Sequence, residues 1–168
     1  MSVAPRPPVA VAAPDPFADR HGLTFEANIG VGFAFAAGGD GTATSSAALA
    51  GLDLGLGGWL TPRLALTFRI SGVDIGGTPT TEVDAFGGPA LQYWADPHFW
   101  VGGGLGLAVL AAENCDGCVE TTFGGDLRAG YSFGDGPSRF DISAELTPAP
   151  FHGAFVTGVA LLIGYQHL

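Results

Sequence analysis

Cysteine and histidine residues are the first candidates for chemistry in this sequence. Cys115 and Cys118 flank an Asp-Gly dipeptide that favours a tight turn. In an oxidising compartment this spacing predicts a disulfide that closes the loop. A catalytic redox pair of the same spacing usually opens a helix in a strand–helix–strand unit, which the surrounding sequence lacks. A zinc site needs two further ligands, and His152 in another loop supplies only one.

Enzyme chemistry finds little support elsewhere in the chain. The Gly-rich run at 102–106 precedes no helix, so it does not predict a phosphate-binding loop. The histidines are scattered, and none has an obvious serine nucleophile and acid beside it. They are His21, His98, His152 and His167. We therefore predict no catalytic residues, no metal site and no cofactor.

Composition excludes further classes of protein. The 168 residues include 16 acids and six basic residues, all of them arginine, which gives a net charge of −10. Without a basic patch to neutralise phosphates, nucleic acid is not expected as a partner. Charged residues make up 13% of the chain and 28 positions are Gly. Soluble domains carry about 25% charged residues and about 7% Gly, so this chain is poorly suited to a fully water-exposed surface.

The chain divides into a tail and one long patterned region. Residues 1–22 are rich in Pro and Ala, which predicts a flexible tail, and the prolines interrupt any continuous apolar segment typical of a signal peptide. No window of 18 apolar residues predicts a transmembrane helix. Residues 23–168 instead follow a period of two. The stretch LTFEANIGVGFAFA at 23–36 places large apolar residues on one face and polar or small residues on the other.

Seven further segments repeat this alternation, which is typical of strands with one apolar face. They are 48–60, 64–71, 83–94, 99–111, 123–133, 139–147 and 155–165. Short turns are expected at 61–63, 95–98 and 134–138, and longer polar loops at 36–46, 74–82 and 113–120, with a shorter loop at 147–153. This arrangement predicts an all-β, eight-stranded antiparallel up-and-down transmembrane β-barrel with short periplasmic turns over residues 23–168.

Two kinds of barrel fit the alternation. A soluble lipocalin-like barrel turns the apolar face inward, whereas a membrane barrel turns it toward lipid. The opposite face is mostly Gly and Ala, which suits a narrow lumen better than a hydrated exterior. Its isolated charges need partners if they are buried. They predict a lumen charge network of Glu26, Asp53, Arg69, Asp84, Asp126, Arg128, Asp141 and Glu145.

Aromatic residues gather beside the short turns, where a membrane barrel has an interfacial girdle. The predicted girdle is Trp59, Tyr93, Trp94, Phe99, Trp100, Tyr131, Phe133 and Phe140. With these strands and the final segment AFVTGVALLIGYQHL, residues 23–168 resemble the small eight-stranded bacterial outer-membrane proteins of the OmpA, OmpX and OmpW type. That family usually ends in Phe, where this chain has Leu168. The resemblance implies a monomer in the outer membrane, inserted by the barrel-assembly machinery, that contacts lipid and lipopolysaccharide.

The favoured role is structural or surface-interacting, with acidic extracellular loops presented by the barrel. The loop acids Asp40, Asp74, Glu82, Glu113, Asp116 and Glu120 form either a solvated rim or a bridge through Ca²⁺ or Mg²⁺ to lipopolysaccharide. Two alternatives stay open: a narrow cation-preferring channel, favoured by the excess of acids on the lumen face, and a soluble lipocalin-like carrier of an apolar ligand. Pro89 within its strand predicts a bulge.

Overall fold

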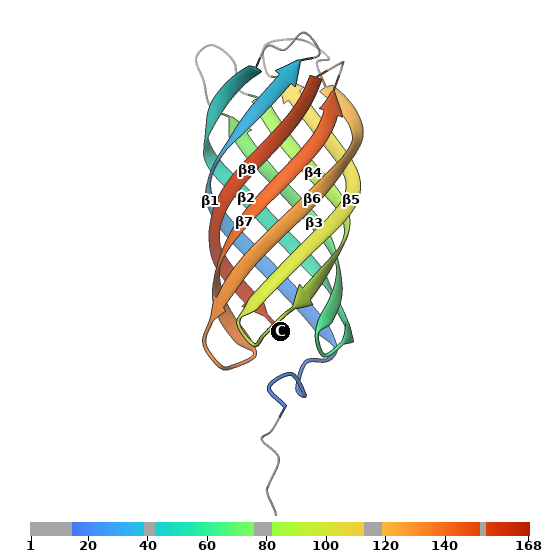
Figure 1. The fold of residues 1–168 in the computed structure, drawn as a ribbon, viewed down its shortest axis with the longest axis vertical. Helices are drawn as coiled ribbons and strands as arrows, with labels where there is room; N and C mark the ends of the chain where they lie inside the picture. The colour runs from blue at the N-terminus through green and yellow to red at the C-terminus, as the bar shows by residue number, and fades with distance from the viewer. Residues whose placement is uncertain (1–14, 39–42, 76–81, 113–118, 152–153) are drawn as a thin grey trace, which may run out of the picture.

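Eight strands, each antiparallel to the next, close into a barrel (Figure 1). The computed structural model describes residues 15–38, 43–75, 82–112, 119–151 and 154–168. The strands are β1 Leu23–Gly38, β2 Ala43–Thr61, β3 Leu64–Ile75, β4 Glu82–Trp94, β5 Phe99–Ala112, β6 Val119–Phe133, β7 Ser138–Phe151 and β8 Ala154–His167. In this described part of the chain no helix is long and apolar enough to cross a membrane.

The period-two alternation sets the two faces of the barrel wall. Each strand pairs with its neighbour in sequence, and β8 closes on β1 with Ile163 opposite Ile29. Successive side chains of a strand point to opposite faces. Along β1, Glu26 and Asn28 are therefore buried inside, while Phe25 and Ile29 are exposed outside. The expected antiparallel up-and-down barrel is confirmed.

Three short connections lie at one end of the barrel, the turn end, together with residues 15–22 and the last residue of the chain (Figure 1). In the β4–β5 turn, the Asp96 carboxylate accepts hydrogen bonds from the backbone N–H groups of His98 and Phe99, each at 2.7 Å. These bonds hold the pKa of Asp96 below its usual range. The β6–β7 turn begins at Gly134, whose φ of 102° favours a residue without a Cβ.

At the opposite end, the loop end, the strands are longer than the sequence predicts. Only residues 39–42 separate β1 from β2, instead of a loop over 36–46. The loop expected at 147–153 is wrong, because β7 continues to Phe151 and pairs Pro148 with Thr157 and Pro150 with Phe155 of β8. A proline lacks only its own N–H, so it can still lie in a strand when that position does not donate to the paired neighbour.

The two prolines leave a seam between β6 and β7. Among the described residues, the ladder between these strands runs from Phe133↔Phe140 to Leu127↔Leu146 and ends there. Beyond that point, residues 119–126 and 147–151 lie next to each other without ladder pairs, and we call this stretch the β6–β7 seam. Proline cannot donate to the facing strand. The interruption therefore falls on the side of β7 that faces β6, while the ladder to β8 is complete.

Pro89 interrupts a second ladder but makes no bulge. The β3–β4 register runs through it without a shift, and the β4–β5 ladder omits only residues 88 and 89 with the same register on either side. A Cβ at Gly88 would lie 2.7 Å from the Cα of Gly106, so the missing side chains let the two backbones approach closely. The expected bulge is wrong. Register shifts occur instead between Gly30 and Gly32 and between Trp59 and Thr61.

Candidate functional site

The outer face of the barrel carries most of the large apolar side chains. Leu105 and Phe123 are 77% and 79% exposed, and every strand contributes similar residues. These include Ile29, Leu56, Phe68, Leu91, Leu105, Phe123, Ile142 and Leu161. A lipocalin-like carrier would bury this face around its ligand, so the soluble alternative is wrong for this structure.

Inside, ion pairs fill the middle of the lumen. Arg69 is fully buried, and its Nη1 donates to Glu26 Oε2 at 2.8 Å. The same guanidinium also pairs with Asp53, and its Nε lies 4.0 Å from Asp126 Oδ2. Asn28 donates its side-chain amide to Glu26 at 2.5 Å and to Asp53 at 3.1 Å. Such partners offset the cost of removing these charges from water.

Arg128 extends this arrangement from β6. Its Nε donates to Asp126 Oδ2 at 2.9 Å, and its Nη1 lies 3.6 Å from Glu26 Oε2. Lumen glycines leave the necessary space, because a Cβ at Gly102 would lie 3.0 Å from Arg128 Nη2, and one at Gly55 would lie 2.7 Å from the other guanidinium. We call the connected residues the ion-pair network: Glu26, Asp53, Arg69, Asp126 and Arg128.

Three further acids of the predicted lumen set lie apart from the arginines. Asp84, Asp141 and Glu145 are buried, and none forms an ion pair with another described residue. Both carboxylate oxygens of Asp141 and Oε1 of Glu145 have no hydrogen-bond partner in the described part of the chain. With Glu26, Asp53 and Asp126, the described residues of the lumen include six buried carboxylates against Arg69 and Arg128, a formal charge of −4 if all are ionised.

One small cavity lies between these acids and the loop end. The cavity beside Glu145, lined also by Ser71 and Thr147, measures about 10 Å³, which is room for about one water molecule. Toward the loop end, buried apolar side chains of the described residues form two clusters. These are Ala34, Val73, Ala160 and Leu162, and Ala108, Ala149, Phe151 and Val156. Side chains fill small barrels in this way.

At the turn end an aromatic cluster closes the lumen. This turn-end cluster comprises Phe17, Trp94, Trp100 and Leu168, with Trp59 packed against it. The predicted place of Trp59, Trp94 and Trp100 in an outer girdle is therefore wrong, because Trp94 and Trp100 are fully buried and Trp59 is half-buried. The alternation itself signals this, since Trp94 follows the outward-facing Tyr93 and Trp100 follows the outward-facing Phe99.

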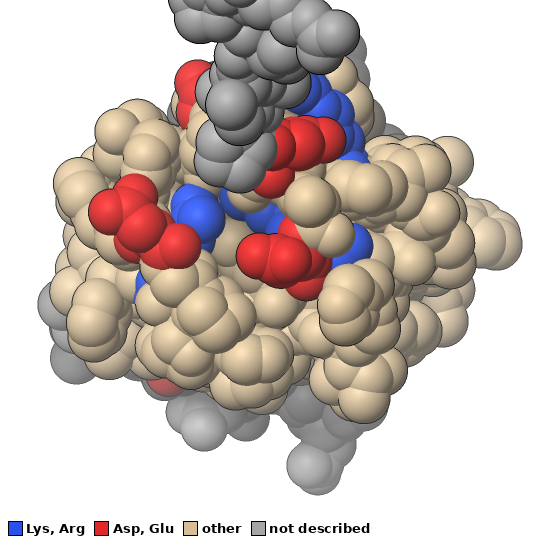
Figure 2. Space-filling model, turned by 90° about the horizontal axis from the view of Figure 1, so that it is seen from below, with Lys and Arg blue, Asp and Glu red and all other residues tan. Residues whose placement is uncertain are grey.

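Residues 15–22 also belong to this end of the barrel. Phe17 and Arg20 are buried, although a flexible tail was expected over 1–22; residues 1–14 lie outside the described part. Figure 2 shows arginine atoms at the centre of this end, with acidic groups beside them and uncharged residues around. The missed signal is Asp15-Pro16, a turn dipeptide placed directly before an aromatic residue.

The structure also brings together a serine–histidine pair at the turn end that the sequence does not predict. Ser138 Oγ lies 3.4 Å from His167 Nδ1, and the Tyr165 hydroxyl donates to the same Oγ at 2.6 Å. A catalytic triad has an acid on the second nitrogen of the histidine, whereas Tyr165 contacts the serine, and the group is exposed at the outside of the barrel. We assign it no catalytic role.

Several predicted residues have no described structure. Cys115 and Cys118 lie outside the described residues, so their disulfide stays a prediction. The loop acids Asp40, Glu113 and Asp116 also lie outside them, and their role stays a prediction. The side chain of Glu82 is also outside the description. Asp74 is exposed and Glu120 half-buried near the loop end. Across the ranges that the structure describes, no three His, Cys, Asp or Glu side chains are placed to hold a metal ion.

Comparison with solved structures places this geometry among known barrels. NspA, a Neisserial surface protein, superposes with a TM-score of 0.64 at 14% identity, covering 86% of this chain and 96% of NspA. Ail of Yersinia pestis, crystallised with the heparin analogue sucrose octasulfate, gives 0.61 at 14% identity, covering 86% of this chain and 98% of Ail. The N-terminal barrel of Pseudomonas aeruginosa OprF gives 0.53 at 14% identity, covering 88% and 99%.

The fold is that of the small outer-membrane barrels. No family model and no curated protein matches the sequence. With this fold, the continuous apolar outer face supports the expected location in the outer membrane.

An outer-membrane barrel gives the other predicted girdle residues a suitable place. Tyr93, Phe99, Tyr131, Phe133 and Phe140 are exposed on strand ends beside the turns. The rings of Tyr131 and Phe133 meet edge to face at 5.1 Å, and His98 stacks on Tyr131 at 5.5 Å. Their role as an interfacial girdle stays a prediction.

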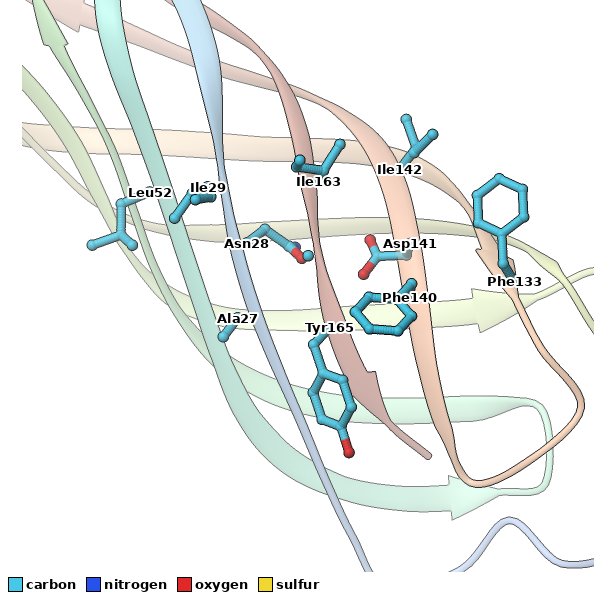
Figure 3. Close-up of a pocket in the computed structure, with 11 residues that line it drawn as sticks. Ala27, Asn28, Ile29, Leu52, Phe133, Phe140, Asp141, Ile142, Ile163 and Tyr165 are labelled. Carbon is cyan, nitrogen blue, oxygen red and sulfur yellow. The ribbon is translucent and has the colours of Figure 1, made fainter.

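The outer face also carries a groove of about 550 Å³ over β7, β8, β1 and β2 and the end of β6 (Figure 3). Its lining is mainly apolar and includes Ile29, Leu52, Phe140, Ile142 and Ile163. Asn28 and Asp141 lie between the strands in this view. Both side chains are buried on the lumen side of the wall, so they add no exposed polar group to the groove. An apolar groove on a lipid-facing wall suits acyl chains.

Proposed function

We propose that this protein is an outer-membrane barrel with a structural or surface-interaction role. The observation that carries the proposal is the filled lumen. Apolar clusters lie toward the loop end, the ion-pair network lies in the middle and the turn-end cluster closes the other side. A barrel whose interior is occupied at three levels acts through its exterior and its loops rather than through a pore.

The exterior fits this role. Lipid contacts the apolar outer face, and the loop acids would meet lipopolysaccharide, directly or through divalent cations, if the turn end faces the periplasm. The names of Ail, an attachment invasion locus protein, and of NspA, a surface protein, support a surface role for the fold. We further propose insertion by the barrel-assembly machinery, a monomeric state and no enzymatic activity.

A narrow cation-preferring channel is the second candidate. The observation that favours it is the excess of buried carboxylates over arginines in the lumen. Asp141 and Glu145 contribute most to this excess, because they form no ion pair with another described residue. Conduction requires the turn-end cluster and the apolar clusters to open, and the cavity beside Glu145 has space for only about one water molecule.

Conductance in a planar lipid bilayer separates the two candidates. The protein is first shown to be folded by its heat-dependent mobility on a denaturing gel. We expect a silent bilayer. Steady conductance with a cation-selective reversal potential, lost in an Asp141→Asn/Glu145→Gln double variant, would replace the structural role by the channel. A monodisperse protein in the absence of detergent would contradict the membrane location itself.

A further inference from the structure

Residues 15–22 form a compact turn fixed to the barrel mouth. The Asp15 side chain accepts a hydrogen bond from the Phe17 N–H at 3.0 Å, and the Asp15 carbonyl accepts one from the Ala18 N–H at 3.1 Å. The Arg20 N–H donates to the Phe17 carbonyl at 3.1 Å. Gly22, at a φ of 82°, then leads into β1, and its carbonyl accepts from the Trp59 N–H at 3.0 Å. The turn is therefore part of the folded structure.

This turn inserts the Arg20 guanidinium into an aromatic site of the barrel. Arg20 Cζ lies 4.0 Å from the ring centroid of Trp94, 5.4 Å from that of Trp59 and 4.8 Å from that of Phe17. Its Nη2 donates to the Pro97 carbonyl at 3.0 Å. Aromatic faces attract cations most strongly when water is excluded, and Arg20 is only 5% exposed.

No carboxylate among the described residues pairs with this guanidinium. The two nearby arginines also rely on rings and backbone carbonyls, since Arg139 donates to Pro97 and Gly136, and Arg63 lies over Phe17 at 4.0 Å. Burial, together with the positive charges of Arg139 and Arg63, lowers the pKa of Arg20 to about 10. The group stays cationic at neutral pH in a site that already contains positive charge, so the aromatic contacts and the Pro97 carbonyl account for its position.

We propose that Trp59, Trp94 and the Pro97 carbonyl form a guanidinium-binding site in the turn-end mouth. Arg20 occupies this site and thereby holds residues 15–22 in place as a plug. A planar, weakly hydrated guanidinium can stack on an indole and donate to a carbonyl at the same time, which a compact ammonium group does less well. An arginine side chain supplied from outside is the class of ligand that would compete once the plug leaves.

The test uses the full chain in detergent micelles and reads tryptophan fluorescence. All three tryptophans of the protein lie in or against the turn-end cluster, so emission reports this site alone. Arg20→Ala should shift emission to the red and raise quenching by acrylamide, with the undocked plug becoming about tenfold more populated. Millimolar methylguanidinium should reverse the change in this variant, methylammonium should do so less well, and neither should affect the unchanged protein.

Asp19→Ala is the matched control, since Asp19 lies in the same turn with an exposed side chain. Its emission and quenching should equal those of the unchanged protein. Heat-dependent gel mobility shows whether each variant is folded. If Arg20→Ala does not fold, Arg20→Lys keeps the charge but loses the stacked plane, and it should give an intermediate shift.

Two outcomes would overturn the proposal. The first is emission and quenching in folded Arg20→Ala or Arg20→Lys that match the unchanged protein. The second is a shift that methylguanidinium does not reverse, because a purely structural role of Arg20 would give this result. Neither outcome depends on whether the bilayer is silent, so this site and the proposed surface role fail separately.

Discussion

Replacing Arg69 by Met is the sharpest test of how the lumen is held together. Arg69 is fully buried and pairs with both Glu26 and Asp53, so its loss leaves two buried carboxylates without their main cation. Breaking a buried pair by removing one partner typically costs about 3 to 5 kcal/mol. We expect Arg69→Met to lower the free energy of unfolding by about that amount, because the other lumen arginine, Arg128, lies 3.6 Å from Glu26 and forms no ion pair with Asp53 in the described part of the chain.

A triple variant separates the charge from the volume it occupies. Arg69→Met with Glu26→Gln and Asp53→Asn keeps similar side-chain sizes but removes every formal charge from that part of the ion-pair network. Replacing a whole buried ion-pair group by neutral residues is often close to neutral, so we expect recovery to within about 1 kcal/mol of the unchanged protein.

The assay is urea unfolding in micelles under conditions where folding is reversible, followed by tryptophan emission and by gel mobility. Arg63→Met is the matched control, because Arg63 is exposed at the barrel mouth, where its guanidinium lies over the Phe17 ring and donates to the Ala95 carbonyl. We expect it to change stability by less than about 1 kcal/mol. The reasoning is refuted if Arg69→Met behaves like this control, or if the triple variant is as unstable as the single one.

The outer wall, the turn-end cluster and the β6–β7 seam give three further tests. Leu127→Arg on the outer face should cost about 2 to 4 kcal/mol in lipid, measured by urea unfolding in vesicles, and a neutral effect would contradict its outward direction. Gly130→Ala places a methyl group against the Trp100 indole; it should cost about 1 to 3 kcal/mol and shift tryptophan emission, whereas Gly136→Ala in the β6–β7 turn should do neither. Hydrogen exchange in micelles should show alternate amides of residues 119–126 exchanging faster than those of residues 127–133, because the seam lacks ladder bonds; uniform protection along β6 would contradict it.

The strands and the direction of most side chains could be predicted from the sequence, because the period of two is a geometric property of every strand. It assigns Glu26, Asp53, Arg69 and Arg128 to the face that the structure buries. The alternation fixes which face a side chain is on but not its partner. The absence of an ion pair between Asp141 and a described arginine therefore could not be predicted from the sequence. It depends on which non-neighbouring strands face each other across the lumen of the closed barrel.

The failures have separate physical causes. Closeness to a turn predicts Trp94 and Trp100 in the outer girdle, but the alternation along the strand decides which face they occupy, and it places both in the lumen. Pro148 and Pro150 predict a loop, but a proline can continue a strand at a position that donates no hydrogen bond to the paired neighbour. Residues 15–22 read as a tail because the Arg20 contacts with Trp59 and Trp94 come from residues far along the chain, and the local Asp15-Pro16 turn signal does not reveal them.

The turn-end cluster has a consequence for the order of assembly. Phe17 precedes β1, Leu168 follows β8, and Trp94 and Trp100 flank the turn in the middle of the sequence. No single hairpin contains these residues, so the cluster cannot form until the first and last strands have met. Contacts of such long sequence separation form late in folding. Tryptophan burial should therefore mark the moment at which the wall closes, and an inserted sheet that is still open should keep this mouth hydrated.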